Sequence, residues 1–407
     1  MIIKNITLLG HKDHGKSTLI GNLLIQTKSV TPARINEAKK TSKKLGRQFE
    51  PGYILDSFSE EREQEMTIDT TRAEMAYKDL AFAFIDVPGH EELIKNMISG
   101  ASYAEIALLM VSAKKEEGIK DQTKRHLFIA KMLGINKLII AVNKMDLVGY
   151  SEDRFNQIRK ELGGFIAKIG FKASNFYFVP VSAYNADNLI KKSGDMSWYK
   201  GKPLVELLYE QAKMEDKRKS TAPLRIVIQG AIESGRQTVV GKVISGRVKT
   251  GSMVSILPFG YKARIESIVV KGKKAKSAGL SDDVALTFES RVSGNLRGTV
   301  VAEGGEAPKL TDKINSLIFV TGGIKKPLKL RINGNEVKCK ALEIAEQVDT
   351  TTGDANEKKG AEVLNAVRAR IVLEKKVPIE DFDEVKELGR FVLYGNNKFA
   401  GIGIISP

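Results

Sequence analysis

The sequence predicts an α/β domain with a doubly wound, mostly parallel sheet, followed by two all-β barrel domains. Two observations support this prediction. From the N-terminus to the charged segment Gln211–Thr221, short and nearly continuous apolar runs alternate with segments of helical periodicity. After that segment the runs are β-rich and punctuated by glycine, and none has a convincing helical pattern.

The first domain is predicted to span residues 1–218. Its apolar runs are hydrophobic almost throughout, which indicates strands buried on both faces, and helices between such strands are typical of a parallel sheet. Ligands of such a sheet bind on the loops at the carboxyl ends of the strands. The runs expected to form the strands are "KNITLLG", "LAFAFIDVPG", "IALLMVSA", "KLIIAVNKMD" and "NFYFVPVSA".

The remaining chain is predicted to form barrel domains over residues 219–307 and 308–407. Runs such as "QTVVGKVISGRVKTGSMVSILP" in the first and "NAVRARIVLEKKVPI" in the second are rich in valine and isoleucine. Short β-rich runs with glycine between them are typical of closed barrels. A chain of 407 residues is also long enough to form more than one hydrophobic core.

Composition narrows the class of protein. Apolar residues make up 42% of the chain and only 11 prolines occur, which is typical of a folded protein. The first residues lack the charged region and cleavage site of a signal peptide, and no apolar run reaches the ~20 residues that cross a bilayer. The single cysteine, Cys339, fits a reducing compartment. We therefore expect a cytoplasmic protein with no membrane partner.

The chain is strongly basic. It carries 65 lysine and arginine residues against 49 aspartate and glutamate residues, which gives a formal net charge of +16. Long-range attraction then favours an anionic partner such as RNA or an acidic protein. A solvated surface accounts for the same charge, so composition alone leaves the partner open.

A phosphate-binding loop follows the first predicted strand. The motif G-x-x-x-x-G-K-[ST] is met at Gly10–Ser17, between a strand and a helix, which is the context that this motif requires. Backbone N–H groups of such a loop surround the β-phosphate, and the Lys16 ammonium is placed to reach the β and γ oxygens. The Ser17 hydroxyl is placed to ligate Mg²⁺. The residues predicted to bind the nucleotide here are His14, Gly15, Lys16, Ser17 and Thr18.

A second element, "FIDVPGH", is predicted to lie near the γ-phosphate. Asp86 ends a strand, where it can hold Mg²⁺ through water, and the N–H of Gly89 can meet the γ-phosphate. His90 follows in the same segment. Because GTP hydrolysis is mostly a matter of positioning and charge stabilisation, an imidazole here can orient the attacking water or stabilise nearby charge. His90 is therefore the predicted catalytic residue.

Two further elements predict that the base is guanine. The first, "VNKMD", supplies Asn143, Lys144 and Asp146. The Asp146 carboxylate can accept hydrogen bonds from N1–H and the 2-amino group of guanine. Adenine lacks both of these donors, so it would leave the carboxylate without partners. In "PVSA", Ser182 and Ala183 close the base pocket and direct a backbone N–H to guanine O6. The first domain is therefore predicted to be a P-loop GTPase domain that binds GTP and GDP.

The stretches "GHKDHGKSTLIGNLL", "EREQEMTID", "DVPGHEELIKNMISGAS" and "VNKMDLVGYSEDRF" resemble the elongation factor 1-alpha/Tu superfamily of GTPases. The similarity covers the first domain and extends more weakly through "ELGRFVL" near the C-terminus. It implies a GTPase domain and two barrels that rearrange between GTP and GDP states. It also implies that Thr67 binds Mg²⁺ and the γ-phosphate, that His90 is catalytic, and that Asp13 is the aspartate of the phosphate loop.

Three branches of this superfamily stay open. "GFKASNFYFVPVSAYNADNL" resembles elongation factor 1-alpha, which implies delivery of aminoacyl-tRNA to the ribosome and, as a possible further partner, a nucleotide-exchange factor. "DQTKRHLFI" resembles the GTPase subunit of heterodimeric ATP sulfurylase (sulfate adenylyltransferase), which implies a catalytic sulfurylase partner. "FDEVKELGRFVLYGNN" resembles ribosome-rescue GTPases, whose partners are proteins that mimic tRNA. The basic charge favours the branches that act in translation.

Three positions depart from the superfamily. Lys12 stands where a valine is usual, and Glu65 and Met66 stand where Gly-Ile is usual before Thr67. The Lys12 ammonium can stabilise charge at the γ-phosphate, pair with Glu65, or extend into water. We hypothesise that GTP hydrolysis is gated differently in this chain.

Overall fold

The structure, a computed structural model, describes residues 2–44, 49–55, 71–86, 104, 106–214, 222–234, 236–303, 305, 307–357 and 360–406. Contacts within the chain define two compact units. The first consists of Met1–Met214 and Thr350–Gly353, and the second of Glu215–Asp349 and Asp354–Pro407. Within the described residues, no helix is long and apolar enough to cross a membrane.

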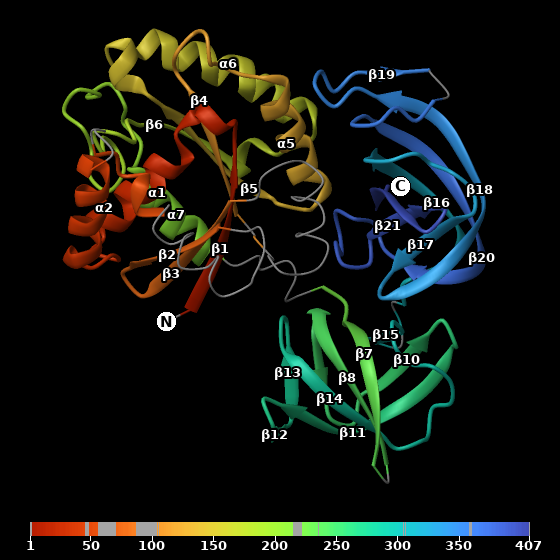
Figure 1. Ribbon diagram of the computed structural model, residues 1–407. Coiled ribbons are helices and arrows are strands. Elements are labelled where there is room, and N and C mark those ends of the chain that lie inside the picture. Colours follow the sequence, from red (N-terminus) through yellow and green to blue (C-terminus); the bar gives the residue numbers. More distant parts are fainter. Residues whose placement is uncertain are drawn as a thin grey trace. The chain divides into compact units, whose positions relative to one another are not determined.

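A mixed sheet forms the centre of the first unit (Figure 1), with the strand order β2-β3-β1-β4-β5-β6. All neighbours are parallel except β2 and β3, which pair as an antiparallel hairpin. Every residue of β4 is buried, as expected for a strand covered on both faces. The strands are β1 (Ile2–Leu9), β2 (Thr71–Tyr77), β3 (Leu80–Asp86), β4 (Ile106–Ser112), β5 (Lys137–Asn143) and β6 (Phe176–Pro180).

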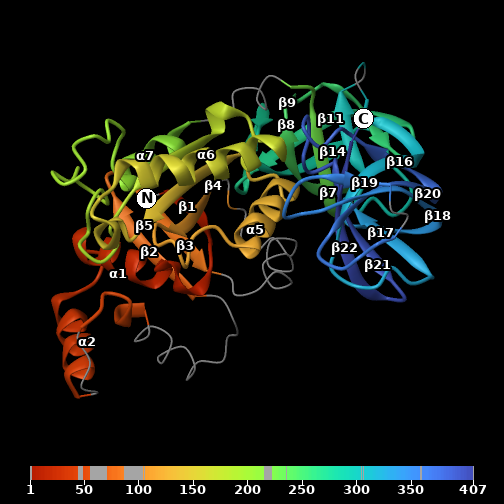
Figure 2. The ribbon, with the colours of Figure 1, turned by 90° about the horizontal axis from the view of Figure 1, so that it is seen from above.

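Helices cover both faces of this sheet. Helices α1, α2 and α7 share one hydrophobic cluster with it, while α5 and α6 lie on the other side (Figure 1). Figure 2 shows α2 at the margin of the unit, away from α5 and α6. The α-helices are α1 (Lys16–Gln26), α2 (Pro32–Lys44), α5 (Asp121–Met132), α6 (Glu152–Lys168) and α7 (Leu204–Lys213). Short 3₁₀ turns are η1 (Lys12–His14), η2 (Met145–Val148) and η3 (Ala173–Asn175).

The second unit contains two closed barrels. In the first, the strand order β10-β15-β7-β8-β14-β11 is closed by pairing of β11 with β10, and β12 is added beside β11. Strands β9 and β13 form a separate ribbon. The strands are β7 (Arg225–Ser234), β8 (Arg236–Ser245), β9 (Arg247–Lys249), β10 (Met253–Leu257), β11 (Tyr261–Val270), β12 (Lys273–Ala275), β13 (Ser277–Gly279), β14 (Asp283–Phe288) and β15 (Val300–Glu303).

The second barrel is closed in the same way. Its order is β17-β21-β22-β16-β20-β18, with β18 pairing back to β17 and β19 added beside β18. The strands are β16 (Lys309–Val320), β17 (Leu328–Ile332), β18 (Asn335–Val348), β19 (Ala355–Asn356), β20 (Ala366–Ile379), β21 (Arg390–Gly395) and β22 (Lys398–Ile405). The predicted fold class, a GTPase-type α/β domain followed by two all-β barrels, is confirmed.

A buried ion pair joins the two barrels. The guanidinium of Arg225 lies 2.6 and 2.7 Å from Oε1 of Glu380, and the side chains are only 6% and 13% exposed. Beside it, Ile244 and Val300 of one barrel pack with Val385 and Leu388 of the other. The two barrels of the second unit therefore meet at a small apolar cluster and a largely buried charge pair.

Replacing Arg225 with methionine is expected to lower the free energy of unfolding by about 3–5 kcal/mol, because the Glu380 carboxylate stays buried without its partner. The measurement is denaturant unfolding followed by circular dichroism. Lys329→Met is the control, since the Lys329–Glu336 pair is more exposed and such pairs contribute about 0–1 kcal/mol. An equal loss of unfolding free energy in the two variants would contradict a stabilising role for the Arg225–Glu380 pair.

Candidate functional site

The phosphate loop has the geometry that its glycines allow. Gly10 and Gly15 adopt φ of 130° and 86°, and Gly15 caps α1 at its N-terminus. A Cβ on Gly10 would lie 2.5 Å from the Met110 carbonyl oxygen, and one on Gly15 would lie 2.5 Å from Nδ2 of Asn143. The loop therefore passes so close to the ends of β4 and β5 that only glycine fits at both positions.

Lys16 folds back over this loop. Its Nζ donates to the carbonyl oxygens of Gly10, at 3.0 Å, and His11, at 3.4 Å. The ammonium is thus held above the loop that is predicted to surround the phosphates. Ser17 and Lys12 are exposed to solvent beside it, and Thr18 is half-buried in the first turn of α1. Asp13 is exposed, with Oδ2 3.4 Å from Nδ1 of His11.

His14 is directed into the protein. Its side chain is fully buried, with Nδ1 2.9 Å from the Met110 carbonyl oxygen and Nε2 3.5 Å from that of Glu117. Burial lowers the pKa of His14, although the two backbone hydrogen bonds act in the opposite direction. A neutral ring that donates through Nδ1 fits this environment. Among the residues predicted to bind nucleotide, His14 therefore places its ring in the core and anchors the loop to β4.

Asn143 joins the phosphate loop to the predicted base pocket. Its side chain is buried; Nδ2 donates to the carbonyl oxygen of His14 at 2.9 Å, and Oδ1 accepts from the N–H of Ala183 at 2.8 Å. The N–H of Ala183, one of the two residues from which a backbone N–H to guanine O6 is predicted, is thus already bonded to Asn143.

Lys144 is held by a carboxylate that the sequence analysis did not identify. The residue adopts φ of 64°, and its Nζ lies 2.6 Å from Oε2 of Glu117. Lys114 lies 3.2 Å from the other oxygen. Burial acts to raise the pKa of Glu117, but hydrogen bonds from Lys144, Ser112 and Lys114 outweigh it and lower this pKa to about 2.

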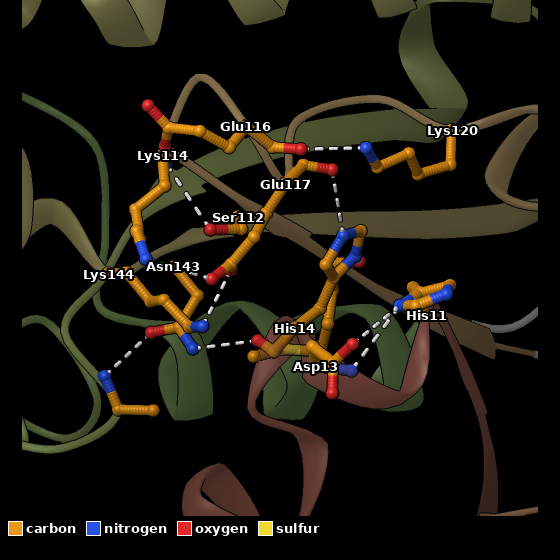
Figure 3. A network of polar contacts seen from close by, with 12 residues as sticks. His11, Asp13, His14, Ser112, Lys114, Glu116, Glu117, Lys120, Asn143 and Lys144 are labelled. Atoms are coloured by element: carbon orange, nitrogen blue, oxygen red, sulfur yellow. Dashed lines mark hydrogen bonds and ion pairs between the residues drawn. The ribbon is translucent and has the colours of Figure 1, made fainter.

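Figure 3 shows how these contacts form one network. The carboxylate of Glu117 meets Lys144, and its backbone carbonyl meets the ring of His14. Glu117 therefore contacts both the base-binding element and the phosphate loop. Nothing in the sequence "KKEEG" distinguishes it from Glu116, whose backbone carbonyl accepts from Lys120.

The base-pocket elements lie together at the carboxyl ends of β5 and β6. Asp146 is half-buried in the first turn of η2, directly after β5. Ser182 and Ala183 are buried directly after β6. Asn22 of α1 donates through Nδ2 to the carbonyl oxygens of Ala183 and Tyr184, a contact that the sequence analysis missed because it spans 161 residues.

Several predicted residues lie outside the part of the chain that the structure describes. Asp86 ends β3 and pairs with Leu8 of β1, so its backbone is at the edge from which the phosphate loop leaves the sheet. Its side chain is not described. The residues outside the described ranges are Glu65, Met66, Thr67, Gly89 and His90.

Comparisons with known proteins identify the family. The model of the elongation factor Tu GTP binding domain matches residues 1–214, and that of the GTP-eEF1A C-terminal domain-like family matches residues 323–406. Elongation factor 1-alpha of Ignicoccus hospitalis is 35% identical, over 99% of this chain and 95% of the relative. That of Saccharolobus solfataricus is 35% identical, over 98% and 96%.

A crystal structure of Sup35 complexed with GMPPNP is also similar, with 24% identity, a TM-score of 0.46, and coverage of 99% of this chain and 93% of the other. The family rests on the two domain models and on the relatives matched along nearly their whole length. The chain therefore belongs to the elongation factor 1-alpha/Tu family and is a GTPase that binds GTP and GDP.

Proposed function

We propose that this chain is a GTP-controlled carrier that delivers aminoacyl-tRNA to the ribosome. The observation that carries the proposal is the extent of the similarity: relatives named elongation factor 1-alpha match both the GTPase domain and the barrels, over 96–99% of the chain. The net charge of +16 supports an RNA partner, because phosphates attract a basic surface over a long range. The alternative to aminoacyl-tRNA is a protein that mimics the shape of tRNA.

The proposed chemistry is transfer of the γ-phosphoryl group of GTP to water. On binding, the Lys16 ammonium exchanges its bonds to the carbonyls of Gly10 and His11 for bonds to β and γ oxygens. The loop N–H groups and the N-terminus of α1 stabilise the same charge. Asp146 is proposed to bind the guanine edge, and His90, outside the described residues, to orient the attacking water.

Mg²⁺ is the proposed metal cofactor. The Ser17 hydroxyl, the Asp86 carboxylate and the hydroxyl of Thr67 are oxygen donors, which suits a hard cation that also takes water and phosphate oxygens. The described residues contain no group of three or more His, Cys, Asp or Glu side chains that could hold a metal ion. When bound, the ion would neutralise charge on the β- and γ-phosphates.

The remaining expectations belong to the same proposal. We propose residues 219–307 and 308–407 as the two barrel domains, a nucleotide-exchange factor as a further partner, and the cytoplasm as the location.

The test is binding of aminoacyl-tRNA by the full chain loaded with a non-hydrolysable GTP analogue or with GDP. We expect binding only with the GTP analogue, and an affinity that falls steeply with salt concentration. Equal binding in the two states, or recovery of a sulfate-activating enzyme instead of RNA or ribosomes in a pull-down, would refute delivery of aminoacyl-tRNA.

Glu117→Gln is expected to speed GDP release about 3- to 10-fold, because loss of one charged hydrogen bond loosens Lys144. Stopped-flow release of a fluorescent GDP derivative measures this rate. The matched control is Glu116→Gln, since Glu116 is bonded through its backbone, which the substitution leaves in place. Identical release rates in both variants would contradict a role for the Glu117 carboxylate.

The same carboxylate predicts a pH dependence of stability. The pKa of Glu117 in the folded chain, about 2, lies below its usual value of 4.5. Its contribution to stability is therefore complete above about pH 4.5 and is lost as the pH falls towards 2. Glu117→Gln should flatten this part of the unfolding profile, measured by denaturation between pH 2 and 6.

Lys12→Val tests the departure in the phosphate loop. The Lys12 side chain is exposed in η1, so solvent screens its charge and limits its effect on the γ-phosphate. Because some stabilisation of charge is lost, we expect intrinsic GTP turnover to fall about 3- to 10-fold. Single-turnover hydrolysis, with and without ribosomes, measures this. Lys172→Val, at an exposed lysine before η3, is the charge-matched control. Unchanged intrinsic and stimulated turnover in Lys12→Val would show that Lys12 does not gate hydrolysis.

A further inference from the structure

We propose that Tyr150 is a positioning residue for guanine selectivity, because it joins the loop that carries Asp146 to the loop that carries Ala183. The proposal rests on the guanine-nucleotide site proposed above. It concerns a residue that does not read the base itself but fixes the distance between the two loops that do.

The backbone of Tyr150 closes the loop after β5. The residue adopts φ of 54° and its N–H donates to the carbonyl oxygen of Met145 at 2.8 Å. Asp146 therefore lies inside the turn that this bond closes. Trp198 donates through Nε1 to the Tyr150 carbonyl oxygen at 3.0 Å, and its ring packs 5.3 Å from that of Phe155 in α6. The position of Tyr150 is thus fixed by Trp198, which packs against α6, as well as by the turn that Tyr150 closes.

The side chain of Tyr150 crosses to the loop after β6. Its hydroxyl donates to Oδ2 of Asp187 at 2.9 Å and accepts from Nδ2 of Asn185 at 3.2 Å. Burial raises the pKa of Tyr150, and the charges of Asp187 and Asp146 act in the same direction, against a hydrogen bond from Asn185. The phenol therefore stays protonated and keeps donating to Asp187 at neutral pH.

The receiving loop is itself closed. Asp187 and Ser182 exchange backbone hydrogen bonds at 3.0 and 3.3 Å, and the N–H of Asn185 donates to Oγ of Ser182 at 3.2 Å. The second oxygen of Asp187 accepts from Oγ of Ser193 at 2.9 Å. Tyr150 thus attaches to a rigid turn whose first residues are Ser182 and Ala183.

The hydrogen bond between Tyr150 and Asp187 matters because two separate loops are proposed to bind the same edge of the base. At their roots they are joined by the N–H of Met145, which donates to the carbonyl oxygen of Val181 at 3.2 Å. The bond between Tyr150 and Asp187 is a second connection, further along both loops. With both in place, the Asp146 carboxylate is held at a fixed distance from Ala183, as recognition within about 0.5 Å requires.

The experiment compares GDP with inosine diphosphate, which lacks the 2-amino group that Asp146 is proposed to bind. Tyr150→Phe removes only the hydroxyl. We expect it to weaken GDP binding about 3- to 10-fold and inosine diphosphate binding less, so that the ratio of the two affinities falls. Competition against a fluorescent GDP derivative gives both affinities.

Tyr177→Phe is the control, because it also removes one hydroxyl that donates a hydrogen bond, here to the backbone carbonyl oxygen of Ser174, away from the two loops. Asp187→Ala, which removes the acceptor, should lower the same ratio, and the double variant with Tyr150→Phe should lower it no further. This second variant keeps the test valid if one substitution impairs folding.

A Tyr150→Phe variant with an unchanged ratio of GDP to inosine diphosphate affinity would overturn the proposal, even if both affinities fell together. Failure of the guanine site itself gives a different result. In that case the unmodified chain would bind ADP as tightly as GDP, and Asp146→Asn would leave GDP binding unchanged.

Discussion

The side-chain amide of Asn143 is the contact on which the nucleotide site depends. It is buried, and its two ends bind backbone groups from segments that are far apart in the chain, at His14 and Ala183. An amide that loses one partner in such a place costs about 1–3 kcal/mol. One side chain of β5 therefore links the phosphate loop to the predicted base pocket, in addition to the bond between His14 and β4.

The charge states of the groups near Asn143 depend on their burial and on their partners in the fold. His14 has a lowered pKa because its ring is in the core, whereas Lys16 stays over the loop carbonyls. The Glu117 carboxylate stays ionised because Lys144 and Lys114 both bind it. Two lysines that look alike in the sequence thus have different partners: Lys16 is bonded to carbonyl oxygens of its own loop, and Lys144 is bonded to the Glu117 carboxylate.

The fold class and the positions of the phosphate loop and the base-binding motifs at strand ends could be predicted from local patterns. Apolar runs in alternation with helices determine the sheet, and the glycines of the phosphate loop are needed where a Cβ would strike Met110 or Asn143. The direction of the His14 ring and the roles of Glu117, Asn22 and Tyr150 could not be predicted. Their partners are 27 to 162 residues away, and a pattern within one segment holds no information on such contacts.

By itself, the sequence determined the fold class, the order of the GTPase motifs and the kind of ligand, because these depend on residue types at short spacing. It did not reveal strand β2, which pairs antiparallel to β3 at the edge of the sheet. Only the tertiary structure decided which N–H and carboxylate groups are already bonded. The N–H of Ala183 is engaged by Asn143, and the hydroxyl of Tyr150 reaches across to Asp187. The reason is physical: a hydrogen bond depends on the distance between two atoms in space, and only the packed sheet sets that distance.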